Sequence, residues 1–154
     1  MHNGIPRTRE KSQQLRKLRA QLSNFLSESE SLAILLIGNP LRGDDGVAMA
    51  LKDGLKEAAK HRKGVHVIAC GEVPENFTGV LRRVAPSHVL LIDAMDFGAQ
   101  PGEIAFFSSS DLTDMSISSH KMSLRVLCRF IEETMNSKVA LIGIQPKKVE
   151  FGVK

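Results

Sequence analysis

The sequence of 154 residues contains no tryptophan or tyrosine and only two cysteines. Aromatic residues make up 5% of the chain, too few for a surface that stacks bases, which disfavours a nucleic-acid partner. No apolar run approaches the ~20 residues needed to cross a bilayer. The first twenty residues lack the apolar centre of a signal peptide, so we expect a cytoplasmic protein with no membrane insertion.

The two cysteines, Cys70 and Cys128, stand far apart in the chain. Cys70 falls in a strand-like run and Cys128 within a helical pattern, where we expect reduced, packed thiols. No disulfide framework is predicted. There is no G-x-S-x-G motif and no Cys–His arrangement, so the sequence argues against covalent catalysis.

Positive charge is concentrated at the N-terminus. Residues 1–30 carry six Lys or Arg against three Asp or Glu, a net of +3, whereas residues 31–154 carry fifteen against fourteen, a net of +1. We interpret 1–30 as an N-terminal helical extension. Its apolar residues recur at helical spacing and predict an amphipathic helix over 10–27: Leu15, Leu18, Leu22, Phe25 and Leu26. Packing against the rest of the chain is its expected role, and docking of a partner is the alternative.

Residues 31–154 have the pattern of a single α/β domain, in which strands alternate with helices. The predicted strands cover 32–37, 65–69, 88–92, 103–107 and 138–143, and the predicted helices cover 46–60, 76–84 and 121–135. We therefore predict a three-layer sandwich with a mainly parallel, twisted sheet flanked by helices. The segment 103–107 is the most amphipathic of the strands, which favours an edge position and leaves an antiparallel orientation open.

Candidate functional residues follow the predicted strands at their carboxyl ends, where open α/β sheets bind ligands. The first strand leads into a glycine-rich loop with Asp44 and Asp45, and the third strand leads into Asp93. His120 stands at the start of a predicted helix that opens at the same edge, after the capping residues Ser118 and Ser119. Asp44 is explained as a helix cap.

The loop is not a phosphate-binding loop, because it lacks both G-x-G-x-x-G and a terminal Lys-Ser/Thr, and two carboxylates would repel a phosphate. A helix N-terminus keeps an imidazole neutral, which suits metal binding. Asp45, Asp93 and His120 together fit an open three-ligand site for a borderline divalent ion. A first-turn acid, a structural carboxylate and a capping histidine are the ordinary alternatives. Three further acids near this edge form a second group: Glu72, Glu75 and Asp96.

Five segments, in this order, resemble the hydrogenase maturation endopeptidases, which trim the C-terminus of the [NiFe]-hydrogenase large-subunit precursor. They are GNPLRGDDG (38–46), GEVPENF (71–77), LLIDAMDFG (90–98), SSHKMSL (118–124) and LIGIQP (141–146). The similarity covers nearly all of 32–151. It is strongest to the members that serve formate-hydrogenlyase-type, membrane-bound hydrogenases.

The resemblance implies specific roles. Asp45, Asp93 and His120 would be the metal-site residues, and Gly38 and Asn39 would shape the first loop. Nickel would arrive already inserted in the precursor, as the signal of maturation, rather than be held by the free enzyme. Cleavage would release a short C-terminal peptide. Whether the metal assists hydrolysis or a carboxylate acts as general base stays open.

Two positions depart from the family pattern. Ala48 stands where the family usually has glycine, and the chain ends at Lys154, where the family commonly continues into another helix. The helix at 10–27 is a candidate to cover the sheet face that this leaves bare. A monomer is then expected, and dimerisation through the bare face is the rival. Two other functions stay open: a non-catalytic, precursor-binding chaperone, and a small-ligand or nucleotide binder that needs no metal.

Overall fold

The computed structural model describes residues 4–39, 41, 46–114 and 119–147, with side chains described from Thr8 onward except at 113 and 119–123. Five strands form one sheet: β1 (Leu32–Ile37), β2 (Val65–Gly71), β3 (His88–Ala94), β4 (Ile104–Ser108) and β5 (Lys138–Ile144). The strand order is β2-β1-β3-β5-β4. β1 pairs in parallel with β2 and β3, β3 pairs in parallel with β5, and β4 is an antiparallel edge strand. The predicted mainly parallel sheet with an antiparallel edge is confirmed.

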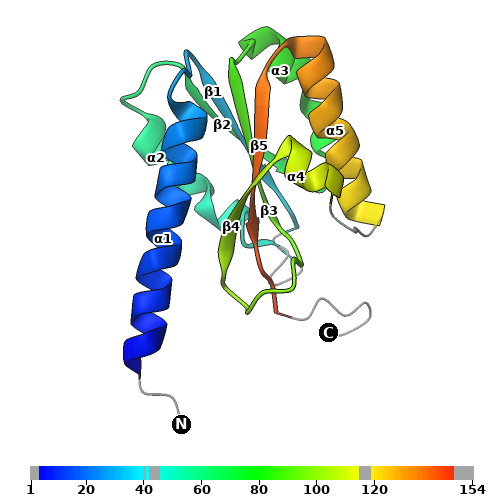
Figure 1. Cartoon of the computed structure of the whole chain (residues 1–154). Coiled ribbons are helices and arrows are strands. Elements are labelled where there is room, and N and C mark those ends of the chain that lie inside the picture. The colour runs from blue at the N-terminus through cyan, green and yellow to red at the C-terminus, as the bar shows by residue number, and fades with distance from the viewer. Residues whose placement is uncertain (1–3, 40, 42–45, 115–118, 148–154) are drawn as a thin grey trace.

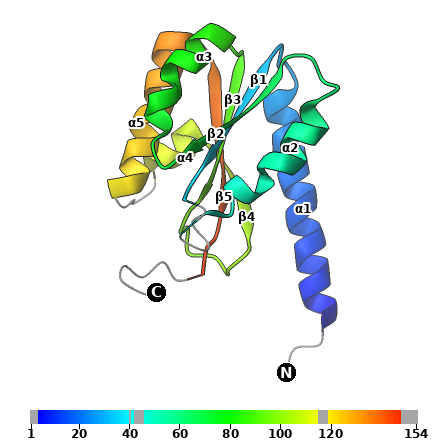
Figure 2. The same cartoon turned by 180° about the vertical axis from the view of Figure 1, so that it is seen from behind.

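Helices cover both faces of this sheet. They are α1 (Gly4–Leu26), α2 (Lys52–Ala59), α3 (Thr78–Val84), α4 (Ser109–Asp114) and α5 (Ser119–Met135), with 3-10 turns η2 (Met49–Leu51) and η3 (Pro74–Phe77). Figures 1 and 2 show α1 and α2 on one face and α3, α4 and α5 on the other. β1 and β3 are buried at every position because they lie in the centre of the sheet, between the two helical layers. In the part of the chain that the structure describes, no helix is both long and apolar enough to cross a membrane.

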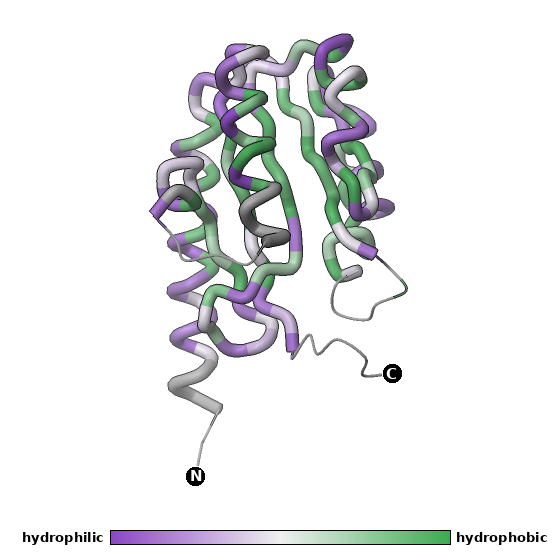
Figure 3. Tube along the Cα trace, turned by 90° about the vertical axis from the view of Figure 1, so that its right-hand side faces the viewer, coloured by the Kyte–Doolittle hydropathy of each residue, from purple (hydrophilic) through white to green (hydrophobic). Residues whose placement is uncertain are grey.

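The α5 face holds one of two hydrophobic clusters. Leu35, Leu91 and Leu141 of the sheet are fully buried there, against Leu127 and Ile131 of α5. Along each strand, residues whose side chains face this cluster alternate with residues whose side chains face the other side of the sheet, because a β-strand is pleated. In Figure 3 the hydrophobic stretches of the tube are concentrated on the strands between the two layers.

The opposite face is covered by α1 and α2. Leu18, Leu22 and Phe25 of α1 pack on the cluster that includes Ile34 and Ile142. The Phe25 ring also meets the ring of Phe106, edge to face, at 5.8 Å between centroids. The predicted covering role of the N-terminal helix is therefore confirmed for its C-terminal half.

Several predicted boundaries shift. The predicted helix over 46–60 begins only at Lys52, because Gly46–Leu51 forms turns and a 3-10 segment that buries Ala48. The strand predicted to end at 92 continues to Ala94, so Asp93 lies within β3 rather than after it. α4 was not predicted. The expected caps Asp44 and Ser118 lie outside the described residues.

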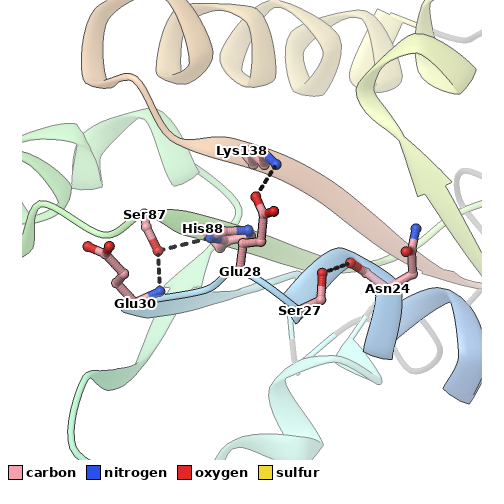
Figure 4. Close-up of polar contacts among 7 residues, drawn as sticks. All are labelled: Asn24, Ser27, Glu28, Glu30, Ser87, His88 and Lys138. Atoms are coloured by element: carbon pink, nitrogen blue, oxygen red, sulfur yellow. Dashed lines mark hydrogen bonds and ion pairs between the residues drawn. The ribbon is translucent and has the colours of Figure 1, made fainter.

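The amino ends of the parallel strands, which we call the amino edge of the sheet, are joined by a network of polar contacts (Figure 4). The Ser87 hydroxyl accepts hydrogen bonds from the amides of Glu30 and Ser31, at 2.9 and 3.0 Å, and donates to the Ser31 carbonyl at 2.9 Å. Ser87 Oγ also lies 2.9 Å from Nδ1 of the buried His88. Lys138 Nζ and Glu28 Oε2, two charged groups near this histidine, lie 3.7 Å apart. These contacts fix the chain where α1 passes into β1.

Candidate functional site

The sheet has a topological switch point between β1 and β3. The chain goes from β1 to β2 on one side and then returns to form β3 on the other side of β1. Open α/β sheets bind ligands in the crevice at the carboxyl ends of such strands. Gly38 follows β1 at this edge, and Asp93 is the next-to-last residue of β3.

Asp93 has no exposed surface. Asp93 lies two residues after Leu91 and four after Val89, so its side chain is on the same face of the strand as theirs, which belong to the cluster under α5. Gly143 pairs with Asp93 on β5. A Cβ atom at Gly143 would lie 3.1 Å from Cε2 of Phe107 and 3.3 Å from Met95, so a side chain here would require these neighbours to shift by a few tenths of an ångström. Asp93 therefore belongs to a tightly packed end of the sheet.

His120 lies in the first turn of α5, which begins at Ser119. Because α5 leads into β5 and runs antiparallel to it, the N-terminus of α5 lies at the carboxyl edge of the sheet (Figure 1). The structure therefore brings the start of α5 and Asp93 to the same edge and the same face. The side chain of His120, and all of Asp45, lie outside the described residues.

The first loop leaves the sheet at Gly38, which is hydrogen-bonded to Gly71 at the end of the neighbouring strand β2. Gly38 has φ 142° and Gly71 has φ 65°, both in the region that favours glycine. The Gly38 amide donates a hydrogen bond of 2.8 Å to the Gly71 carbonyl, beside a register shift between Leu36 and Ile37. Asn39 Oδ1 accepts a 2.8 Å hydrogen bond from the Leu41 amide, which supports its predicted role in shaping this loop.

Gln145 is a residue of this edge for which no role was predicted from the sequence. Its side chain is buried, and Oε1 accepts hydrogen bonds from the amides of Phe97 and Ala99 at 2.9 and 3.2 Å. Its Nε2 donates to Oδ1 of Asp96 at 3.1 Å. Gln145 therefore stabilises the turn that follows β3. The first of its partners in this turn, Asp96, lies three residues after Asp93. The segment LIGIQP marked the position, but an apolar strand pattern does not reveal which polar group is buried after it.

The second group of acids is exposed. Glu72 follows β2, and Glu75 lies within η3, as expected for a helix-start element. Asp96 accepts hydrogen bonds from Gln145 and from the Gly98 amide, so its carboxylate stabilises the turn. Within the described ranges, no group of three His, Cys, Asp or Glu side chains is arranged to hold a metal ion.

Both cysteines are free and buried, as predicted. Burial raises the pKa of the Cys70 thiol to about 12. Burial, reinforced by the negative charge of Glu132, raises the pKa of Cys128 to about 12 as well. Neither thiol is ionised at neutral pH, so neither can act as a thiolate nucleophile.

The sequence model of the hydrogenase maturation protease family HycI matches residues 49–154, which include β2 to β5 and α5. The chain belongs to this family. Among the curated members that it resembles, the hydrogenase 3 maturation protease of Escherichia coli K12 is 35% identical over 119 residues, which is 77% of this chain and 74% of that protein.

Two archaeal relatives extend this family comparison. A putative hydrogenase maturation protease of Methanocaldococcus jannaschii is 28% identical over 140 residues, covering 87% of this chain and 83% of its own length. The crystal structure of a [NiFe] hydrogenase maturation protease HycI from Thermococcus kodakarensis KOD1 matches with a TM-score of 0.75 and 31% identity, covering 82% of this chain and 81% of that one. This maturation protease therefore shares both sequence and fold with its family, and it is a peptidase.

Proposed function

We propose that this protease removes the C-terminal extension of a nickel-loaded [NiFe]-hydrogenase large-subunit precursor, and that Asp45, Asp93 and His120 recognise the nickel. The observation that carries the proposal is the position of Asp93. Its carboxylate is buried at the switch point of the sheet, on the face where α5 begins with His120 in its first turn. Open α/β sheets bind ligands at such a switch point, which favours a functional role for a carboxylate placed there.

Nickel is part of the substrate in this proposal. Two carboxylates and one neutral imidazole are oxygen and nitrogen ligands that suit a borderline divalent ion. The partial positive charge at the N-terminus of α5 disfavours the imidazolium form of His120, which keeps a ring nitrogen available. Because Asp93 has no exposed surface, the metal would reach it only as neighbouring groups give way when the precursor binds. The free enzyme would then hold nickel weakly.

The reaction is hydrolysis of one peptide bond. The oxygen of a water molecule bonds to the scissile carbonyl carbon, the carbon–nitrogen bond breaks, and the leaving nitrogen takes up a proton. A carboxylate of the site can accept the proton of the attacking water and pass it on. The substrate's nickel can instead polarise the carbonyl. With both described thiols un-ionised, a thiolate intermediate is not part of either route.

Intact mass spectrometry of a [NiFe]-hydrogenase large-subunit precursor tests the proposal. We expect the precursor to lose one discrete C-terminal peptide in the presence of this protein, only when nickel has been inserted. An unchanged mass together with a stable complex would overturn the proposal in favour of a precursor-binding chaperone. Loss of the peptide without nickel would refute the nickel requirement.

Substitution of the three residues separates their roles from a general loss of folding. Asp45→Ala, Asp93→Ala and His120→Ala are each expected to abolish processing. Asp96→Asn, at an exposed acid of the same edge, keeps the hydrogen bonds of its turn and should still process the precursor. Circular dichroism checks that each variant is folded. Full processing by any of the first three would remove that residue from the proposed site.

A further inference from the structure

The N-terminal half of α1 is a basic projection of the molecule. α1 as a whole carries six Lys or Arg and one Glu, a net of +5. Among the described side chains of this helix, all the basic ones are exposed: Arg9, Lys11, Arg16, Lys17 and Arg19. The residues that anchor the helix to the sheet begin only at Leu18. The basic half is therefore held at one end and otherwise faces solvent.

This half passes the carboxyl edge of the sheet. Gln14 Nε2 lies 3.5 Å from Oε1 of Glu103, which directly precedes β4. Ile104, the first residue of β4, pairs with Ile144, the last residue of β5, so Gln14 is level with that edge. The ten residues 4–13 therefore extend about 15 Å beyond it, at 1.5 Å per residue. Figures 1 and 2 both show this end of α1 beyond the strands.

The row of α1 residues that faces the sheet, here called the packing stripe, changes from apolar to charged where the helix passes the carboxyl edge. It runs through Leu22 and Leu18 to Leu15 and then to Lys11, at spacings of four, three and four residues. Leu15 is 59% exposed, although Leu18 and Leu22 pack on the sheet. The stripe thus continues past the end of the sheet with a charged residue.

A recess along the same half of the helix adds a second feature. It is lined by Thr8, Arg9, Ser12, Gln13 and Arg16. Two of the five lining residues are arginines, and the other three are Thr, Ser and Gln. Hydroxyl, amide and guanidinium groups of this kind suit carboxylate side chains, which arginine binds in a bidentate manner.

From the charge, the exposure and the position at the site edge, we infer that residues 8–17 of α1 form a docking arm for an acidic surface of the precursor that the site processes. This inference rests on the proposed function. A protein substrate whose metal centre lies at the carboxyl edge has α5 on one side and the arm on the other. Negative side chains beside that centre would meet Arg9, Lys11 and Arg16, which steer association and fix the orientation of the substrate.

Charge reversal tests the arm against a matched control. The arm variant is Arg9→Glu/Lys11→Glu/Arg16→Glu, and the control is Lys60→Glu/Arg62→Glu/Lys63→Glu, which reverses three exposed charges at the opposite, amino edge. Both variants change the net charge equally. We expect the arm variant to raise the Kd and KM for the nickel-loaded precursor about tenfold, mainly through slower association, with kcat unchanged. The control should stay within about twofold of the parent.

Two further measurements complete the test: the salt dependence of precursor binding, and binding of the arm to other negatively charged partners. The difference between the arm variant and the parent should shrink as sodium chloride is raised, because salt screens exposed charges. Equal precursor Kd values for the arm variant and the parent would overturn the inference, even if the arm proved necessary for binding phosphatidylserine vesicles or duplex RNA. Binding by the parent without cleavage would refute the proposed protease function while leaving the arm testable by Kd. Absence of both binding and cleavage would refute both.

Discussion

The two edges of the sheet are built differently. At the amino edge, Ser87 and His88 tie the starts of β1 and β3 together through hydrogen bonds of 2.9–3.0 Å (Figure 4). At the carboxyl edge, β1 and β2 end in glycine turns at Gly38 and Gly71, and the carboxylate of Asp93 in β3 has no exposed surface. The amino edge joins the starts of two strands through side-chain hydrogen bonds, and the carboxyl edge holds a carboxylate with no exposed surface at the switch point of the sheet.

This difference separates stability from activity. Interactions of the amino edge connect elements that are far apart in sequence, so their loss should lower the free energy of unfolding without touching the reaction. Groups of the carboxyl edge should affect the reaction more than the stability. The following substitutions test that division, beginning with the largest expected effect.

Asp93→Asn preserves the shape of the buried side chain and removes its charge. We expect processing of the nickel-loaded precursor to fall by about 10²–10⁴-fold, the range for loss of a group that transfers protons in the transition state. The measurement is the initial rate of peptide release, followed by mass spectrometry. Asp96→Asn is the matched control, since Asn can still accept the hydrogen bonds of Gln145 and Gly98. A rate within about threefold of the parent for Asp93→Asn would show that the carboxylate is structural.

Gln145→Ala should affect both properties. It leaves the amides of Phe97 and Ala99 without their acceptor, and a lost buried hydrogen-bond partner costs about 1–3 kcal/mol. Because the turn follows β3 directly after the site, we also expect about a tenfold lower processing rate. Chemical denaturation and the processing assay measure the two effects. Gln100→Ala, at an exposed position of the same turn, should change neither. Loss of stability with full activity would assign Gln145 to the fold alone.

Much of this carboxyl edge could be predicted from the sequence, because the central strands are continuous apolar runs. The segments LAILLI and HVLLI predict strands that are buried on both faces. HVLLI directly precedes Asp93, so the sequence also predicts this residue at a strand end. The packing stripe of the N-terminal helix was equally clear in Leu18, Leu22 and Phe25. The role of Gln145 was not predictable, because its hydrogen-bond partners at 96–99 are brought to it only by the pairing of β3 with β5.

α4 was missed although its start carries a local pattern. The Asp111 amide donates to Ser108 Oγ at 3.1 Å, and Oδ2 of Asp111 accepts from the Ser108 amide at 2.8 Å. This is a reciprocal capping box, written in the sequence as Ser-Ser-Ser-Asp. The helix that follows is too short for apolar periodicity to appear, and Leu112 is the one buried residue among its described side chains. Capping residues therefore locate short helices better than hydrophobic spacing does.

Ser87→Ala tests the amino edge. The hydroxyl serves the amides of Glu30 and Ser31 and the carbonyl of Ser31, so we expect a loss of about 1–3 kcal/mol in the free energy of unfolding. Processing at a temperature where the variant is folded should be unchanged. Ser27→Ala, which removes one exposed hydrogen bond to the Asn24 carbonyl, is the control and should cost less. Impaired processing by folded Ser87→Ala would contradict the division between the edges.

The smallest expected effect is a pH dependence at the amino edge. Burial, reinforced by the positive charge of Lys138, lowers the pKa of His88, against the opposing influence of the Phe25 carbonyl and Glu28. The folded state therefore binds fewer protons here than the unfolded state. The contribution of His88 is fully present above the ordinary histidine pKa of about 6.5 and declines as the pH falls below it.

Thermal unfolding between pH 7.5 and 5 measures this dependence. We expect the Tm of the parent to fall more steeply with acidification than that of His88→Gln, because the neutral amide has no proton to gain. His66→Gln, at an exposed histidine of β2, should keep the slope of the parent. The histidine ring lies edge to face with Phe25, at 5.1 Å between centroids, so its protonation places a charge against the helix that also carries the docking arm. Equal slopes for the parent and His88→Gln would show that the amino edge holds α1 independently of this proton.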